Sequence, residues 1–205
     1  MAAQLPSERQ GEIQGILGDM EDGLNRVASI VSDLRKFTHP DLSSMDGVDV
    51  NLVVTSALRF LSGDWRDTVQ FERNVPAGFT VWSNNGLLVH VVVNLLQNSL
   101  DALKEKAFDN GEKPTIWIEG RQGADKGLLV VRDNGTGIDP KHMDKIFDPF
   151  FTTKDVGQGM GLGLSICYGI IKQSHGRVWV SRSEPGRLCE FTLEFPITKP
   201  QETAV

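Results

Sequence analysis

The N-terminal part of the chain has a heptad pattern of apolar positions. Spacings of four and three alternate along one series, with charged residues at many other positions: Ile13, Leu17, Met20, Leu24, Val27, Val31 and Leu34. This pattern predicts one long helix, at about residues 8–38, whose apolar stripe packs against another helix or another chain. Packing against its own domain is the alternative. The helix should end near Phe37, because Pro40 disfavours helical geometry in the residue before it, and residues 39–47 are predicted to be a linker.

The rest of the chain alternates between helical and strand-like patterns. Helices are predicted at residues 51–61, 85–107 and 164–173, with Asn51 capping the first. The second should bury one side, formed by Leu88, Val91, Val92, Leu95, Leu96 and Leu100. Strands are predicted at 68–74 and 79–83 around a turn, and in two hairpins, 115–122 with 128–135 and 177–183 with 189–195. This order predicts an α+β, two-layer sandwich with helices on one face of a sheet.

Composition narrows the classes of protein. The 205 residues are 40% hydrophobic, enough for a domain core, and the net charge of -6 argues against a nucleic-acid surface. The longest apolar run, LLVHVVVNLL, is interrupted by His90 and Asn94 and falls short of a membrane span. The first residues do not resemble a signal peptide, and Cys167 and Cys189 suit free buried thiols in a reducing compartment. We therefore expect a cytoplasmic chain without membrane contact.

The predicted helix at 85–107 carries the first candidate site, the stretch NLLQNSLDA at 94–102. Asn94, Asn98 and Asp101 are spaced so that they share one stripe of the helix. Amide and carboxylate oxygens on one stripe suit Mg²⁺ or its waters. A polar face turned to solvent is the alternative.

Two further stretches have the composition of ligand-binding loops. In DNGTGI, residues 133–138, Asp133 ends a predicted strand and could accept a hydrogen bond from the amino group of a base. Gly135 and Gly137 would let a flat ring lie against the backbone, although a simple turn explains the same residues. In IFDPFFTTK, residues 146–154, three phenylalanines indicate a loop that packs onto something and moves, with plain packing as the alternative.

The fourth stretch is glycine-rich: GQGMGLGL, residues 157–164, leads directly into a predicted helix. It matches neither the dinucleotide fingerprint nor the P-loop. Unpaired amides at a helix N-terminus favour a polyphosphate, so the stretch is a candidate phosphate-binding loop. A flexible linker is the alternative, but linkers do not usually alternate glycine with Met and Leu.

Together, these four stretches resemble the N, G1, F and G2 boxes of the sensor histidine kinase catalytic domain, in the superfamily of gyrase, heat-shock chaperone, histidine kinase and mismatch-repair ATPases. The resemblance covers residues 48–196, and DGLNRVASIVSDLRKF upstream resembles the second helix of the family's dimerisation and phosphotransfer hairpin. It implies a Bergerat fold, a mixed sheet of about five strands under three helices, preceded by the coiled-coil-like helix at 8–38. Residues 1–47 would be the partial dimerisation segment and linker, and 197–205 a disordered tail.

The resemblance also implies roles for individual residues. Asn98 would coordinate Mg²⁺, with Asn94 and Asp101 on the same face and Asp133 binding the adenine amino group beside Gly135 and Gly137. A lid would be anchored by Phe147, Phe150 and Phe151. Lys154 would reach phosphate, and the remaining ATP contacts would come from Thr152, Thr153, Gly157, Gly159, Met160, Gly161, Leu162 and Gly163. Asn94, Asn98 and Lys154 are the expected catalytic residues.

Asn94 favours phosphoryl transfer over hydrolysis, because hydrolases of the superfamily tend to place a Glu base here and a neutral amide cannot deprotonate water. The family's phospho-accepting histidine motif is absent, and we expect none of His39, His90, His142 and His175 to serve as acceptor. The sequence therefore indicates a kinase core that phosphorylates a histidine outside this chain, dimerises through the helix at 8–38 and serves a response regulator receiver domain. An ATP hydrolase, a serine kinase of the same superfamily, and a regulatory dimerisation module are the alternatives.

Overall fold

The computed structural model describes residues 20, 45–61, 65, 68–109, 111–154 and 159–200. The chain divides into two units, Met1–Asp41 and Leu42–Val205, and of the first only Met20 falls within the described ranges. The heptad helix predicted at 8–38 therefore lies outside the described residues, as do the last five residues of the predicted tail. The start of that tail is tied to the domain, since the Ile197 amide donates to the Asp125 carbonyl at 3.1 Å.

The second unit is built on a mixed five-stranded sheet with the order β2-β4-β5-β7-β6. Its strands are β2 (Gln70–Asn74), β4 (Thr115–Gln122), β5 (Lys126–Asp133), β6 (Arg177–Glu184) and β7 (Leu188–Pro196). β2 runs parallel to β4, and the other neighbours are antiparallel. Both predicted hairpins are confirmed, and β5 occupies the centre of the sheet, so the loop after β5 leaves from its middle.

A separate two-stranded sheet pairs β1 (Asp46–Asp49) with β3 (Thr80–Ser83) in antiparallel register. The strands predicted on either side of the turn at 76–78 both exist, but they join different sheets. The predicted linker was wrong at its end, because Asp46 and Gly47 pair with Ser83 and Trp82. Only one side chain of β1 is buried, which leaves too little periodicity to reveal the strand in the sequence.

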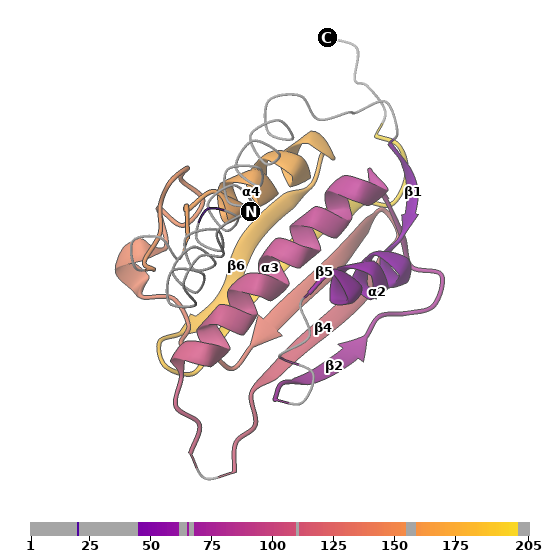
Figure 1. The fold of residues 1–205 in the computed structure, drawn as a ribbon. Coiled ribbons are helices and arrows are strands. Elements are labelled where there is room, and N and C mark those ends of the chain that lie inside the picture. The colour runs from indigo at the N-terminus through magenta and orange to yellow at the C-terminus, as the bar shows by residue number, and fades with distance from the viewer. Residues whose placement is uncertain are drawn as a thin grey trace, which may run out of the picture. The chain divides into compact units, whose positions relative to one another are not determined.

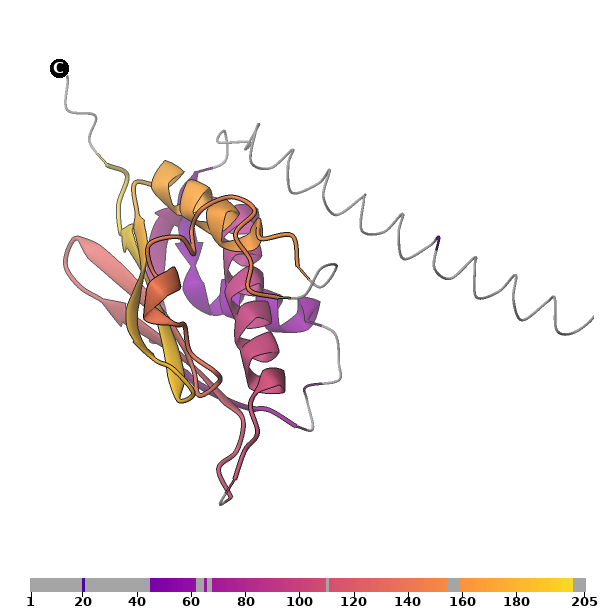
Figure 2. The ribbon, with the colours of Figure 1, turned by 90° about the vertical axis from the view of Figure 1, so that its left-hand side faces the viewer.

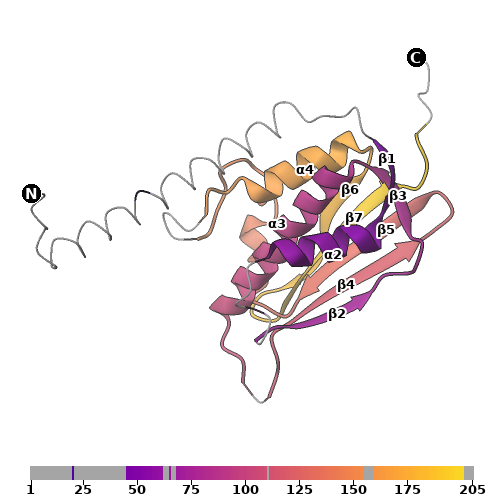
Figure 3. The same cartoon turned by 45° about the vertical axis from the view of Figure 1, so that its right-hand side comes forward.

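Three helices cover one face of the five-stranded sheet (Figures 1 and 2). They are α2 (Val50–Phe60), α3 (Asn85–Glu105) and α4 (Gly163–Gln173). α3 lies between α2 and α4 and contacts both, as Figure 3 shows. The predicted α+β, two-layer sandwich is therefore confirmed for the described residues, in which the other face of the sheet carries no helix.

The start of α2 differs from the prediction. Its N-cap is Asp49, whose carboxylate accepts from the amides of Asn51 and Leu52 at 2.7 and 3.2 Å. Asn51 lies inside the helix, and its side-chain NH₂ group donates to the Pro76 carbonyl at 2.7 Å. The earlier carboxylate satisfies two free amides of the first turn, which leaves Asn51 to join α2 to the turn after β2.

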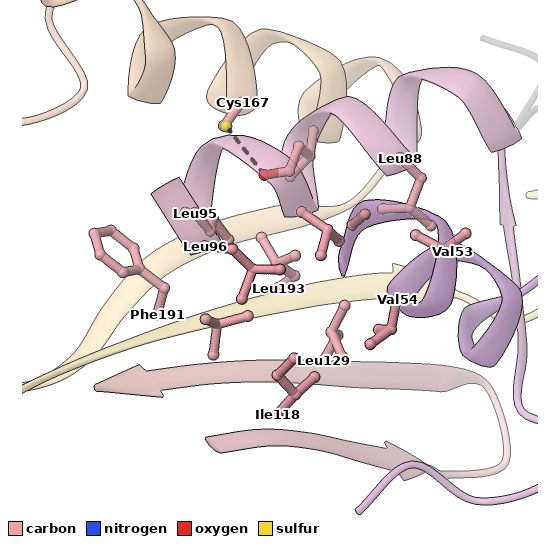
Figure 4. Close-up of a cluster of buried hydrophobic side chains, with 14 of the residues drawn as sticks. Val53, Val54, Leu88, Leu95, Leu96, Ile118, Leu129, Cys167, Phe191 and Leu193 are labelled. Carbon is pink, nitrogen blue, oxygen red and sulfur yellow. Dashed lines mark hydrogen bonds between the residues drawn. The ribbon is translucent and has the colours of Figure 1, made fainter. Parts of the chain in front are cut away.

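The core lies between the three helices and the sheet. All six apolar residues predicted for the buried side of α3 are at most 4% exposed. They meet Val53 and Val54 from α2, and Ile118, Leu129 and Leu193 from the strands (Figure 4). The burial of one side of α3 holds both neighbouring helices against the sheet.

Among the described residues, α3 alone is long and apolar enough to cross a membrane. Its most apolar stretch is 44% buried inside the domain, and core helices meet the same criteria of length and composition. The apolar character of α3 is therefore explained by its position in the core.

Phe79 sets how closely the start of β3 packs against the β4–β5 hairpin. Its ring is fully buried, and it lies over two glycines of that hairpin. A Cβ at Gly127 would come within 2.5 Å of the Phe79 ring, and one at Gly120 within 2.9 Å. Neither strand tolerates a side chain at this point unless the ring moves.

We expect Gly127→Ala to lower the free energy of unfolding by about 1–3 kcal/mol, because overpacking displaces a buried ring. Urea denaturation monitored by circular dichroism measures the change. Gly47→Ala is the matched control in a strand, since a Cβ there meets nothing within 4 Å. Equal stability of the two variants would contradict the packing role of Phe79.

Candidate nucleotide site

The polar stripe of α3 faces away from the core. Asn94, Asn98 and Asp101 are all half-buried on this helix, as their spacing predicted. The Asn98 amide makes no hydrogen bond within the part of the chain that the structure describes, whereas Asp101 is bonded to Gln97 and Lys154. Asn98 therefore has a free oxygen and a free NH₂ group to offer to a ligand.

Asp133 is buried at the end of β5, where it contacts α3. It is 2% exposed, and Ser99 on α3 donates its hydroxyl to Oδ2 at 2.8 Å. The Gly135 amide donates to Oδ1 at 2.9 Å. The carboxylate is thus oriented from two sides, and each oxygen keeps a lone pair for a further donor.

Burial raises the pKa of Asp133 from 3.8 to about 6. The hydrogen bonds from Ser99 and Gly135, and the charge of Lys106, act in the opposite direction but do not offset the loss of hydration. Asp133 is therefore ionised in most molecules at pH 7. A buried, ionised carboxylate with spare acceptor capacity is suited to an amino group of a heterocyclic base.

The two glycines after Asp133 are required by close backbone contacts within the domain. A Cβ at Gly135 would lie 2.8 Å from the backbone of Ala102, so only glycine lets the loop approach α3 this closely. Gly137 has φ +67°, and a Cβ there would lie 2.5 Å from the Glu184 carbonyl. These two glycines set the path of the loop that follows Asp133.

The phenylalanine-rich segment, residues 146–154, is only partly packed down. Phe147 and Phe151 pack against the core, with ring contacts to Tyr168 and His142 respectively. Phe150 does not anchor the segment in this structure, since it is 72% exposed at φ 67°. The two threonines before Lys154 are exposed as well.

The second half of the glycine-rich stretch leads into α4. Gly157 lies outside the described residues, whereas Gly159, Met160, Gly161, Leu162 and Gly163 are half-buried. Gly161 has φ +67°, and a Cβ there would lie 2.5 Å from the backbones of Phe150 and Phe151. The stretch therefore passes directly against the phenylalanine-rich segment.

The N-terminus of α4 faces α3. Its N-cap, Leu162, offers no side-chain acceptor, so the first amides of the helix lack a capping side chain. A Cβ at Gly163 would lie 3.8 Å from the side chain of Asn94, which also lies 3.4 Å from the His90 ring. The structure thus places both Asp133 and the start of α4 against α3.

The described histidines and both cysteines have structural surroundings. His90 contacts Asn94, the His142 ring lies tilted against the Phe151 ring, and His175 is in the turn after α4 at φ 55°. His39 lies outside the described residues. The free, buried cysteines are confirmed, and burial raises the pKa of Cys167 to about 12, so its thiol stays neutral.

A cavity of about 600 Å³ lies near the end of α3 and the turn between β6 and β7, and Asn134, the residue after Asp133, is part of its lining. Its cations each face a carboxylate: Lys106 pairs with Glu112, Arg132 with Glu119 and Glu190, and Arg182 and Arg187 with Glu184. None of the predicted ATP-binding residues lines it. We therefore do not assign the nucleotide to this cavity.

Comparison with known proteins decides the family. Residues 83–199, more than half of the chain, match the family described as "Histidine kinase-, DNA gyrase B-, and HSP90-like ATPase". The chain belongs to this ATPase family. The matched residues include all four motifs that the sequence analysis singled out.

Curated relatives place the ATPase domain among sensor kinases. The sensor histidine kinase ZraS of Salmonella typhi is 30% identical over 93% of this chain and 39% of its own length. The sensor kinase CckA of Brucella abortus is 31% identical over 87% of this chain and 20% of its own. The chain therefore spans well under half the length of these relatives.

Solved structures agree with this placement. The catalytic domain of the histidine kinase ThkA is 27% identical, with a TM-score of 0.64 over 76% of this chain and 99% of that domain. ThkA in complex with the response regulator TrrA gives a TM-score of 0.66 at 24% identity, over 96% of this chain and 53% of that one, and supports the fold alone. The chain thus contains the catalytic ATP-binding domain of the sensor histidine kinase type, as its motifs predicted.

Sequence reasoning missed two supporting residues of this ATPase domain. Ser99 orients Asp133, and Gln97 donates to Asp101 at 2.9 Å. A small polar residue on the otherwise apolar, buried side of a helix was the available signal for Ser99. Gln97 is exposed, and nothing in the sequence separates it from other surface residues.

We expect Asp133→Asn to stabilise the ATPase domain at high pH. The pKa of Asp133 is raised in the folded state. The free energy of unfolding therefore falls as the pH rises from about 3.8 to about 6, because the unfolded chain loses the Asp133 proton before the folded domain does. The shift of roughly two units corresponds to about 3 kcal/mol at most. The Asn side chain stays neutral, and its carbonyl oxygen keeps the hydrogen bond from the Gly135 amide. The Ser99 hydroxyl rotates to accept a hydrogen bond from the new NH₂ group.

Urea denaturation at pH 5 and pH 8 measures this effect, and the advantage of the Asn variant should grow with pH. Asp139→Asn is the control, because Lys141 lowers the pKa of exposed Asp139. That variant should gain no stability at pH 8. An advantage of Asp133→Asn that does not change with pH would show that the buried charge carries no cost.

Proposed function

We propose that this chain is the ATP-binding core of a sensor kinase that transfers the γ-phosphoryl group of ATP to a histidine not present in this chain. The observation that carries the proposal is the buried Asp133 carboxylate, held by Ser99 from the same helix that presents Asn98. One helix thereby links a base-recognising group to a phosphate-side group. Membership in the ATPase family and the likeness to sensor kinases support the assignment.

Asp133 would select adenine over guanine. The ionised carboxylate accepts hydrogen bonds but donates none, so it attracts the exocyclic amino group of adenine and repels the carbonyl oxygen of guanine. Its low exposure strengthens this discrimination, because few waters compete for the carboxylate.

Asn98 is suited to hold Mg²⁺ together with the phosphates. The described residues contain no cluster of three or more His, Cys, Asp or Glu side chains that could hold a metal ion. Mg²⁺ commonly takes one or two protein ligands and completes its shell with water and phosphate oxygens, which fits a single uncommitted amide oxygen. When bound, the ion would neutralise charge on the phosphates. The uncapped amides of α4 would meet the same phosphates.

Asn94 favours kinase activity over hydrolysis. Its amide contacts the His90 ring and lies beside the start of α4, and an amide does not take a proton from water at pH 7. An ATP hydrolase or a serine kinase of the same superfamily remains the second candidate. A regulatory dimerisation module is a weaker one, since all four motifs retain their ligand-type side chains.

The partners follow from the sensor-kinase assignment. We propose a homodimer through residues 8–38, a response regulator receiver domain as the recipient of the phosphoryl group, and a cytoplasmic location for this domain. The sequence contains no acceptor motif of the family, so the phosphorylated histidine would lie elsewhere in a longer protein or in another chain.

We expect Asn98→Ala to abolish the Mg²⁺-dependent part of ATP binding, and Asp133→Ala to weaken ATP binding about 10- to 100-fold while GTP binding changes little. Calorimetry with both nucleotides, with and without Mg²⁺, measures these effects. Glu105→Gln, at the exposed end of the same helix, is the control. Unchanged ATP affinity in both site variants would refute the site.

We expect the chain to phosphorylate a separate protein that carries a sensor-kinase dimerisation hairpin with its histidine. Radiolabelled ATP should yield an acid-labile, base-stable label on the hairpin, and Asn98→Ala should abolish that label. Steady release of phosphate without the hairpin protein would instead favour the hydrolase.

A further inference from the structure

Asp101 and Lys154 form an ion pair between α3 and the phenylalanine-rich segment. Lys154 Nζ lies 2.5 Å from Asp101 Oδ2, and each side chain is 26% exposed. The two residues are 53 positions apart in the sequence, so the pair exists only in the folded domain. It is the contact that places a cation of this segment beside the polar stripe of α3.

Both carboxylate oxygens of Asp101 are already engaged. Gln97 Nε2 donates to Oδ1 at 2.9 Å, and Lys154 occupies Oδ2. Asp101 is one helical turn from Asn98 on the same stripe, where a carboxylate would repel a triphosphate. Charge repulsion therefore disfavours a direct contact between Asp101 and the phosphates of ATP.

Lys154 makes contacts at both its backbone and its charged end. Its amide donates to Thr152 Oγ1 at 3.1 Å, which tightens the backbone before it. A Cβ at Gly159 would lie 3.2 Å from Lys154 Cδ, so the aliphatic part of the side chain passes close to this glycine. Gly159 leaves room for the lysine, and Asp101 fixes its charged end.

We propose that Asp101 is a positioning residue: it holds the Lys154 ammonium beside Asn98, ready to meet the phosphates of ATP. The inference rests on the proposed ATP-binding function and identifies how its cation is prepared. A free lysine side chain loses rotamer freedom when it binds an anion, and an ion pair formed beforehand removes most of that cost. Asp101 thus acts on ATP through Lys154.

A double-mutant cycle with Asp101→Asn and Lys154→Ala tests the proposal. In the wild-type background, Asp101→Asn should weaken binding of Mg-ATP about three- to tenfold, because the ammonium is released. In the Lys154→Ala background the same substitution should strengthen binding, because only the repulsion between the carboxylate and the phosphates remains. Adenosine, which has no phosphates, should bind all four proteins equally, which a merely structural role would not predict.

Calorimetry with Mg-ATP and adenosine reads out the cycle, with thermal unfolding to verify folding and Glu105→Gln as the control on the same helix. Asp101→Asn that weakens ATP binding equally in both backgrounds would make Asp101 a direct ligand and overturn the proposal. Tighter or unchanged ATP binding in the wild-type background would overturn it as well. If the wild-type chain binds no ATP, the proposed function fails. If ATP binding depends on Asn98 and Asp133 but the effects of the Asp101 and Lys154 substitutions are independent, only the positioning role fails.

Discussion

The packing of α3 across the middle of the sheet is the constraint on which the rest of the domain depends. Its buried side contacts β5 and joins α2 to α4, and its opposite stripe carries Asn94, Asn98 and Asp101. Because α3 carries both the buried apolar residues and the polar stripe, a shift of the core would move the candidate site as well. The geometry of the site is therefore set by hydrophobic packing more than by the polar contacts within it.

Asp133 shows what this arrangement costs. Burial against α3 raises its pKa to about 6, so the ionised carboxylate destabilises the folded domain at neutral pH. Two oriented hydrogen bonds, from Ser99 and Gly135, offset part of that cost and fix the direction of the carboxylate. A group that reduces stability and is nevertheless carefully oriented fits a binding role, and the ATPase family provides one.

The parts of the proposed site are held to different degrees. Asp133 and Asn98 belong to β5 and α3, which the core fixes in place. Lys154 depends on a single ion pair to α3, and Phe150 in the same segment is exposed. The proposed base-recognising group thus lies on elements of the core, while the proposed cation for the phosphates depends on a contact that the folded domain has to supply.

Local patterns in the sequence determined the strongly periodic elements. Helix α3, its six buried residues and the two hairpins follow from spacing alone, because each repeats its pattern over seven residues or more. The four motifs also indicated the ATPase family, since they combine ligand-type side chains in one order. Weak or short signals failed: β1 buries one side chain, and the cap of α2 depended on a choice between Asp49 and Asn51.

Tertiary structure alone decided which groups meet. The contact of Ser99 with Asp133, the pair of Asp101 with Lys154 and the fit of Gly135 against Ala102 join residues more than thirty positions apart. Periodicity records only which face of an element is apolar, whereas these contacts depend on how elements are arranged around the core. The sequence by itself therefore determined the elements and the candidate residues, and the packing of α3 on the sheet decided how those residues act together.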